Sequence, residues 1–455
     1  MIPAEAQLPG TIHLCLDRNK GRWDARQLQE GSMGTGRAAT GLLALTLAAM
    51  TVGYVIGVSF HEPQVAQAAG GEVKTRTGPA PKRYVYYPGT EQLRKDEIRM
   101  TACGTGMPAA RHGQAASCFL IELGNGDKFL FDLGTGSMAN VGAYMIPYDF
   151  LTKVFLSHLH TDHWGDLGPL WAGGWTAGRT KPLEVWGPSG AREDMGTKYA
   201  VEHFLKTYNW DYMTRAAVIT PVPGQIIVHE FDYKKENQVI YQKNGVTIRS
   251  FPAIHTGDGP VSLILEWKGY KIVYGGDTMP NTWMLKYAKN ADIVIHEVMP
   301  MPADMVKFYN QPPQLAIRAS CGFHTCAPAF GKIMSQLKPR LAVAFHWFNE
   351  EGTRYHQLEG IRETYDGELS MATDNLVWNI RKNEIIERMA VITEEAWAVP
   401  GATKQPGPDR TRKSEYTPWT LGHVYDTSDV EKETVDEFNK EFKLKPAPYK
   451  PQKPE

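Results

Sequence analysis

The feature that most constrains this chain is a histidine-rich run at residues 157–163, with the sequence SHLHTDH. It directly follows the apolar residues 154–156, which have the composition of a short buried strand. Because three imidazoles and one carboxylate stand so close together at a strand end, a turn there brings them towards one point. Imidazole nitrogens are ligands that suit zinc. The run therefore predicts a metal site at the end of this strand.

Three further candidate ligands end other apolar strands. His255 ends the strand-like sequence VTIRSFPAIH, Asp277 ends KIVYGGD, and His346 ends RLAVAFH. Strand ends are where α/β folds place functional groups. Taken alone, each of these residues would more often be structural. Together with the run 157–163 they supply enough ligands for two metal ions.

The body of the chain alternates short strands with turns and helices, twice over. Asn-Gly or Lys-Gly pairs at 125–126, 244–245 and 268–269 separate apolar runs and indicate hairpins. Helical periodicity appears at residues 192–208, 282–290 and 327–338. Each half begins with a β-meander, so two sheets packed face to face with helices outside are expected.

These motifs, taken together, resemble the metallo-β-lactamase superfamily of dinuclear metallohydrolases over about residues 97–380. Asp132, in FLFDLGTG, resembles the early Asp that braces the histidine loop in this family. The sequence GTGMP at 104–108, the pair His296-Glu297 and His324 resemble the ribonuclease Z and arylsulfatase-like branch. The resemblance implies an α/β fold, a four-layer αββα sandwich of two mixed β-sheets with outer helices.

The resemblance also implies a dinuclear centre built from five imidazoles and two carboxylates. The expected ligands are, for the first metal, His158, His160 and His255; for the second, Asp162, His163 and His346; and for both, Asp277. Two Zn²⁺ ions are expected, with iron or manganese as alternatives. They would activate a bridging hydroxide near neutral pH and neutralise charge at the attacked centre.

Three residues are expected to assist the chemistry. Asp162 would orient the attacking group, and His324 would protonate the leaving group, with Glu297 or His296 as its hydrogen-bonding partner. Diiron oxygen-reducing members usually carry Glu where this chain has His160, which favours zinc. Iron-binding dioxygenase-like members keep the histidines, so an iron-dependent oxidoreductase is an alternative. An inactive scaffold is disfavoured because the ligand set is complete.

The substrate expected from the sequence is a small ester: a phosphodiester, an aryl sulfate or a lactone-type ester. Trp164, Trp175, Trp283 and Trp347 stand next to ligand loops and would form an aromatic-walled mouth, whereas Trp186 and Trp210 are expected in the core. The alternative is a ribonuclease Z-like endonuclease, which would need a basic surface. The formal net charge is −1 and no dense Lys/Arg stretch separates the ligands, so there is no strong nucleic-acid signal.

The ends of the chain differ from its body. Residues 38–60 carry no charged side chain, and a helix of this length could cross a hydrocarbon layer of about 30 Å. The sequence AQA at 66–68 suits cleavage by signal peptidase. The expectation is an exported (periplasmic or secreted) or membrane-anchored protein. Four parts are expected: an N-terminal extension, 1–68; a linker, 69–96; a catalytic domain, 97–395; and a Pro/Lys-rich tail, 396–455, with one short helix at 429–442.

Cysteine usage agrees with export without requiring it. Four cysteines follow the apolar run: Cys103, Cys118, Cys321 and Cys326. An oxidising compartment could pair all four, and Cys321 and Cys326 are close enough in sequence to close a small loop. Four buried free thiols are an equally good interpretation. The sequence predicts no oligomeric state.

Overall fold

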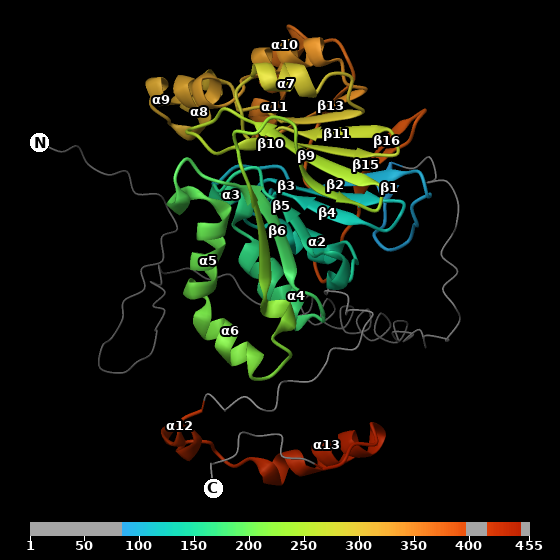
Figure 1. The fold of residues 1–455 in the computed structure, drawn as a ribbon, viewed down its shortest axis with the longest axis vertical. Coiled ribbons are helices and arrows are strands. Elements are labelled where there is room, and N and C mark those ends of the chain that lie inside the picture. The colour runs from blue at the N-terminus through green and yellow to red at the C-terminus, as the bar shows by residue number, and fades with distance from the viewer. Residues whose placement is uncertain (1–83, 397–415, 447–455) are drawn as a thin grey trace, which may run out of the picture. The chain divides into compact units, whose positions relative to one another are not determined.

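The computed structural model describes residues 84–396 and 416–446, and residues 84–396 form two stacked β-sheets with helices on their outer faces (Figure 1). Within that range one sheet has nine strands in the order β1-β16-β15-β2-β3-β4-β5-β6-β7, and the other has seven in the order β14-β13-β12-β11-β10-β9-β8. The αββα sandwich of two mixed sheets is therefore confirmed.

The strands of the nine-stranded sheet are β1 Val85–Tyr86, β2 Ile98–Gly104, β3 Cys118–Leu123, β4 Lys128–Phe131, β5 Lys153–Phe155, β6 Leu183–Pro188, β7 Ile226–Phe231, β15 Leu376–Ile380 and β16 Ile385–Ala390. Those of the seven-stranded sheet are β8 Gln238–Lys243, β9 Val246–Pro252, β10 Val261–Trp267, β11 Tyr270–Tyr274, β12 Ile293–Glu297, β13 Leu341–Phe345 and β14 Leu369–Met371. The hairpins expected at 125–126, 244–245 and 268–269 connect β3 to β4, β8 to β9 and β10 to β11.

Alternation along the strands builds three packed layers of apolar side chains. On β3, Phe119 and Ile121 belong to the core between the sheets, whereas Leu120 belongs to the core under the outer helices. On β12, Ile295 belongs to the core between the sheets, and Val294 belongs to the core under the helices that cover the seven-stranded sheet. Because both faces of these strands are buried, their sequences are apolar almost throughout.

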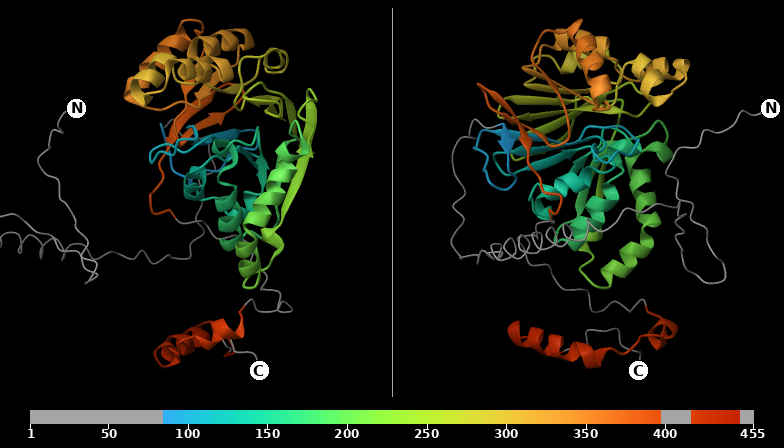
Figure 2. Two further views of the ribbon diagram at one scale, coloured as in Figure 1. Left: turned by 90° about the vertical axis from the view of Figure 1, so that its left-hand side faces the viewer. Right: turned by 180° about the vertical axis from the view of Figure 1, so that it is seen from behind.

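The helices divide between the two outer faces (Figures 1 and 2). The helices beside the nine-stranded sheet are α2 Ser137–Ala143, α3 Thr161–Trp164, α4 Gly174–Thr176, α5 Thr197–Thr207 and α6 Asn209–Ala216. Those beside the seven-stranded sheet are α7 Thr282–Tyr287, α8 Pro302–Tyr309, α9 Pro313–Arg318, α10 Ala327–Leu337 and α11 Glu351–Arg362. The helices expected from periodicity correspond to α5, α7 and α10.

The remaining expectations about the ends of the chain have mixed outcomes. The sheet begins earlier than residue 97, because β1 lies in the expected linker and pairs in parallel with β16. The helix expected at 429–442 is present as α13, Ser428–Glu441, and α12, Pro418–Gly422, precedes it. The apolar segment 38–60 lies outside the described residues. Within the part that is described, no helix is both long and apolar enough to span a membrane.

Candidate metal centre

All seven expected metal ligands come together where strands of the two sheets end. His158 follows β5 of the nine-stranded sheet, and His255, Asp277 and His346 follow β9, β11 and β13 of the other. Since β11, β12 and β13 run parallel, their carboxyl ends meet at one edge. Segments nearly two hundred residues apart, such as Asp162 and His346, thereby come into contact, with Asp162 Oδ2 3.2 Å from His346 Nε2.

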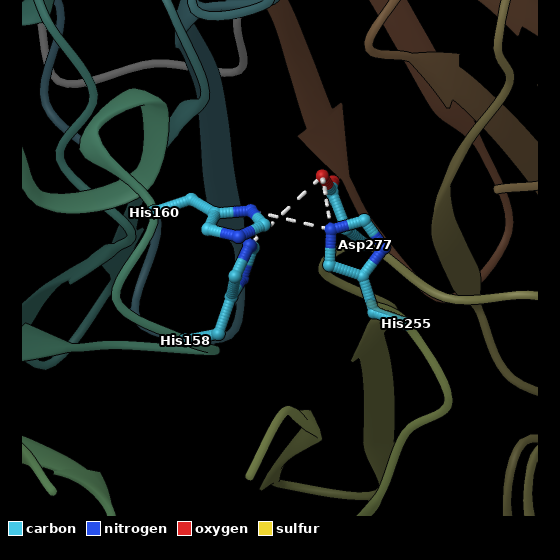
Figure 3. Close-up of side chains that lie close together, drawn as sticks. All are labelled: His158, His160, His255 and Asp277. Atoms are coloured by element: carbon cyan, nitrogen blue, oxygen red, sulfur yellow. Dashed lines mark hydrogen bonds and ion pairs between the residues drawn. The ribbon is translucent and has the colours of Figure 1, made fainter. Parts of the chain in front are cut away.

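One group of ligand atoms lies around one oxygen of Asp277 (Figure 3). Asp277 Oδ2 is 4.0 Å from His158 Nε2 and 3.8 Å from His255 Nε2. His255 Nε2 is in turn 3.2 Å from His160 Nδ1. The four ligand atoms lie within 4.8 Å of one another, a spacing that leaves room for one cation between them.

A second group of ligand atoms shares the same carboxylate. It joins Asp162, His163 and His346 to Asp277, again with ligand atoms within 4.8 Å. Asp277 Oδ1 is 3.2 Å from His163 Nε2, and Asp277 Oδ2 is 3.2 Å from His346 Nε2. Asp277 thus belongs to both groups, which is the arrangement expected for a bridging ligand.

Orphaned polar atoms show that this cluster fits a metal. His158 Nε2, His163 Nε2 and Asp277 Oδ1 are buried and have no hydrogen-bond partner. Leaving a buried polar atom unpaired costs about 1–3 kcal/mol, so atoms in this state usually have a ligand. All three belong to the two groups described above, and imidazole and carboxylate donors suit zinc.

One carboxylate orients two of these imidazoles. Asp132, fully buried after β4, accepts a hydrogen bond from His163 Nδ1 at 2.6 Å. It also accepts from the Ser157 backbone N–H and hydroxyl at 2.7 and 2.6 Å, and Ser157 Oγ lies 3.0 Å from His158 Nδ1. Tyr274 donates a further bond at 2.6 Å. These contacts direct the Nε2 atoms of His158 and His163 into the cluster.

Electrostatics at the centre favour a cation. Burial alone would lower the pKa of His163, yet the three carboxylates around it hold this pKa well above its ordinary value. Burial lowers the pKa of His255 to about 4, so its ring is neutral at pH 7. Its Nδ1 donates to the Phe323 carbonyl at 2.9 Å, so Nε2 is the acceptor nitrogen, and it lies within the first group of ligands.

The backbone on either side of the centre takes conformations that few residues adopt. Gly276 has φ +61°, and a Cβ there would lie 2.6 Å from the Ser157 side chain, which explains the glycine before Asp277. His346 itself has φ +66°, a strained value for a residue with a side chain. Such strain concentrates at functional sites, and here it turns the His346 ring towards the carboxylates.

His324 contacts Glu297 beside the metal ligands. His324 Nδ1 lies 2.6 Å from Glu297 Oε2 and 3.8 Å from Asp277 Oδ2. Glu297 ends β12 and is fixed by the Thr278 backbone N–H, which donates to its other oxygen at 2.6 Å. His296 points elsewhere: it is fully buried and packs edge-on against Phe330. The partner of His324 is therefore Glu297 and not His296.

The loop that carries His324 is closed by a disulfide. Cys321 and Cys326 are paired, and a second disulfide, Cys103–Cys118, joins β2 to β3. Inside the closed loop, Thr325 Oγ1 donates to the Thr278 carbonyl at 2.7 Å. The sequence left the pairing of these cysteines open, and the structure pairs all four.

A cavity of about 650 Å³ adjoins the centre on the side of His158 and His160. Trp164 lines it, and Trp283 lines a neighbouring cavity of about 390 Å³. The expectation for two other tryptophans was wrong: Trp175 and Trp347 are 0% and 1% exposed and pack in the cores under the outer helices. Trp210, expected in the core, is 78% exposed.

Sequence reasoning found Asp132, which the structure places on His163 and Ser157, but it missed the other residues that support the ligands. Ser157 was quoted only as the first residue of the histidine run, and its position beside His158 was the available signal. Tyr274 and the Phe323 carbonyl gave no signal. A tyrosine in an apolar strand is common, and every residue has a backbone oxygen, so neither stands out in a sequence. Their roles depend on contacts across 142 and 68 residues.

Replacing Asp132 with asparagine is expected to weaken metal binding by about 10–100-fold, the usual effect of changing a group that orients a ligand. The amide has the same size but cannot accept every hydrogen bond that Asp132 accepts, so His163 loses its fixed orientation. Competition with a fluorescent chelator measures the affinity. Asp166→Asn is the matched control, because this buried carboxylate accepts from the Met138 backbone. Equal affinities in Asp132→Asn and the wild type would contradict the orienting role.

Comparison with known proteins gives consistent matches. A family model for the beta-lactamase superfamily domain matches residues 128–347. Ribonuclease Z of Mycobacterium marinum is 30% identical over 234 residues, which cover 50% of this chain and 78% of that protein. Ribonuclease Z of Mycobacterium bovis is 31% identical over 236 residues, with the same coverage of 50% and 78%.

Solved structures with a similar chain path are more distant. The metallo-beta-lactamase fold protein YhfI from Bacillus subtilis is 19% identical, with a TM-score of 0.47 over 63% of this chain and 100% of that one. Human tRNase Z, short form, is 19% identical, with a TM-score of 0.45 over 61% and 98% of the two chains.

Proposed function

The chain belongs to the metallo-beta-lactamase superfamily, in its ribonuclease Z-like branch, and is a metal-dependent hydrolase of ester bonds; we propose that it uses two metal ions and acts on small phosphodiesters. The observation that carries the dinuclear part is the position of Asp277 in both ligand groups. A carboxylate that lies between two sets of imidazoles, with contacts to both, is suited to bridging two cations.

The donor set supports zinc, with iron or manganese as alternatives. His158, His160 and His255 would hold one ion, Asp162, His163 and His346 the other, and Asp277 both. When bound, two such ions would lower the pKa of a water molecule and neutralise the charge that develops on the phosphate.

The chain's own residues would supply orientation and proton transfer. Asp162 would accept a hydrogen bond from the attacking water and so aim it at phosphorus. His324, whose Nδ1 lies 3.8 Å from Asp277 Oδ2, would give a proton to the departing oxygen. Glu297 would hold the His324 ring in place through the 2.6 Å contact at Nδ1, which leaves Nε2 free to reach the substrate.

A second candidate is cleavage of phosphodiesters in RNA, which the ribonuclease Z relatives favour. Against it stand the near-zero net charge and the apolar lining of the cavity beside the centre. A protein that neutralises many phosphates needs clustered Lys and Arg. Small diesters therefore remain our first proposal.

We further propose that the enzyme works outside the cytoplasm, as an exported or membrane-anchored protein. The two disulfides support this proposal, because such bonds persist in oxidising compartments. The apolar segment 38–60 supports it from the sequence. A substrate met in that setting would be a small molecule and not a precursor RNA.

A substrate panel tests the proposed function. The purified protein, with metals counted in the same sample, is assayed on bis(p-nitrophenyl) phosphate, p-nitrophenyl sulfate, a nitrophenyl phosphonate, a lactone and a structured RNA. We expect about two metal ions per chain and the highest kcat/KM on the phosphodiester. Cleavage of RNA without cleavage of the small diester would favour the second candidate, and one ion per chain would contradict the dinuclear site.

A further inference from the structure

The 650 Å³ cavity next to the metal centre extends beyond the metal ligands, and the proposed chemistry assigns no role to the rest of it. Its walls are His158 and His160 on one side, helix α5 on another, and the loop 256–260 between β9 and β10. Building on the proposed function, we propose that this cavity binds the organic group that stays on the phosphate after cleavage, and that this group carries an aromatic ring.

The wall formed by α5 and the residue after it is made of rings that pack against one another. Tyr199 and His203 stack with centroids 3.9 Å apart and an interplanar angle of 27°, and Phe204 and Tyr208 lie 4.7 Å apart. Trp164, directly after the histidine run, adds a further ring to the lining. Because the rings already pack against one another, they form a fixed apolar surface that offers faces and edges to another ring.

Part of this ring surface has no protein covering it. Tyr199 is 38% exposed and Tyr208 is 42% exposed, while both line the cavity. Apolar surface left open in a concavity beside a catalytic centre is typical of a ligand site. The surface is continuous with His160, which is itself exposed on the same side.

The charges of the cavity oppose a polyanionic occupant. Of the described residues that line it, none is Lys or Arg. Its two carboxylates already have partners within the protein. Asp194 forms an ion pair with Arg192 at 3.0 Å, and Asp258 accepts a hydrogen bond from the Tyr233 hydroxyl at 3.1 Å. A further phosphate would find no Lys or Arg in the lining, so the cavity disfavours an anionic group, and its aromatic wall favours an apolar one.

The position of His324 indicates which half of the diester occupies the cavity. His158 and His160 line the cavity, but His324 does not. The departing oxygen must lie near His324 to receive its proton. With the leaving group there, the retained group extends past His158 and His160 towards α5.

Two substrates with the same leaving group test this assignment in the full-length chain. Bis(p-nitrophenyl) phosphate retains an aromatic group, and ethyl p-nitrophenyl phosphate retains a small alkyl group. We expect a lower KM for the first, and we expect the double variant Tyr199→Ala, Tyr208→Ala to reduce this preference by about 10-fold. Tyr355→Ala is the matched control, because Tyr355 is a 66% exposed tyrosine on α11. It should leave both KM values unchanged. An unchanged preference in the double variant, or no preference in the wild type, would overturn the proposal.

A binding measurement separates this proposal from the proposed function. Calorimetry compares phenylphosphonate with ethylphosphonate in the wild type and in the double variant. If neither diester is cleaved, the proposed function fails, yet tighter binding of phenylphosphonate that is lost in the double variant still supports the cavity assignment. Equal binding of the two phosphonates to the wild type would overturn it whatever the activity.

Discussion

Replacing Asp277 with asparagine should reduce phosphodiester turnover by more than about 100-fold, because changing a group that only orients a metal ligand already costs about 10–100-fold. Asparagine has nearly the same size, so the buried site keeps its packing. It has no charge and only one oxygen, so it cannot keep both the contact of Oδ1 with His163 and the contacts of Oδ2 with the other imidazoles, and it binds cations more weakly. We expect the metal content to fall as well, while thermal unfolding shows that the fold survives.

The experiment measures kcat/KM on bis(p-nitrophenyl) phosphate, metal content and the unfolding temperature in one preparation. Asp304→Asn is the matched control, because Asp304 is also a buried carboxylate (2% exposed) that contacts an imidazole, His356, at 2.8 Å. It should keep wild-type turnover and metal content. Full activity and full metal content in Asp277→Asn would show that Asp277 does not bridge.

The sequence was sufficient to predict where the candidate ligands would meet. His255, Asp277 and His346 each end an apolar strand, and the strands before Asp277 and His346 belong to a parallel set whose carboxyl ends meet at one edge. Strand ends are local signals, so they can be found without knowing the fold. The pairing of the two sheets then followed from the alternation of strands and helices together with the resemblance.

Side-chain direction was not predictable in the same way. Trp347 follows His346, and adjacency to a ligand suggested that it would face the site. The left-handed backbone at His346, φ +66°, turns the next residue into the core under the outer helices instead. No sequence pattern predicts that value of φ for a histidine. The prediction that Trp210 lies in the core was wrong for a related reason, since the exposure of a side chain on α6 depends on what packs against that helix.

Contacts between segments far apart in the sequence were also not predicted. The two-residue strand β1 is too short to show a periodicity, and its partner β16 lies about three hundred residues further along. The cavity beside the centre depends equally on distant parts, because α5 and the loop 256–260 meet only in the folded chain. Such features are set by tertiary contacts and not by local propensity.

The second large effect is expected at His324. His324→Gln should lower kcat by about 10²–10⁴-fold on diphenyl phosphate, whose phenolate needs a proton as it departs. On bis(p-nitrophenyl) phosphate the loss should be far smaller, because the nitrophenolate is stable without that proton. The structure supports this role through the 2.6 Å contact to Glu297 and the loop closed by Cys321–Cys326, which fix the ring beside Asp277.

A purely structural role for His324 would give a different result. If the variant only loosened the loop, the Phe323 carbonyl would release His255 and both substrates would slow alike, with loss of metal. Steady-state kinetics on the two diesters, with metals counted, separates these cases. His356→Gln is the matched control, since His356 also contacts a buried carboxylate, Asp304, at 2.8 Å and should leave both rates unchanged. Equal slowing of the two substrates by His324→Gln would rule out proton donation to the leaving group.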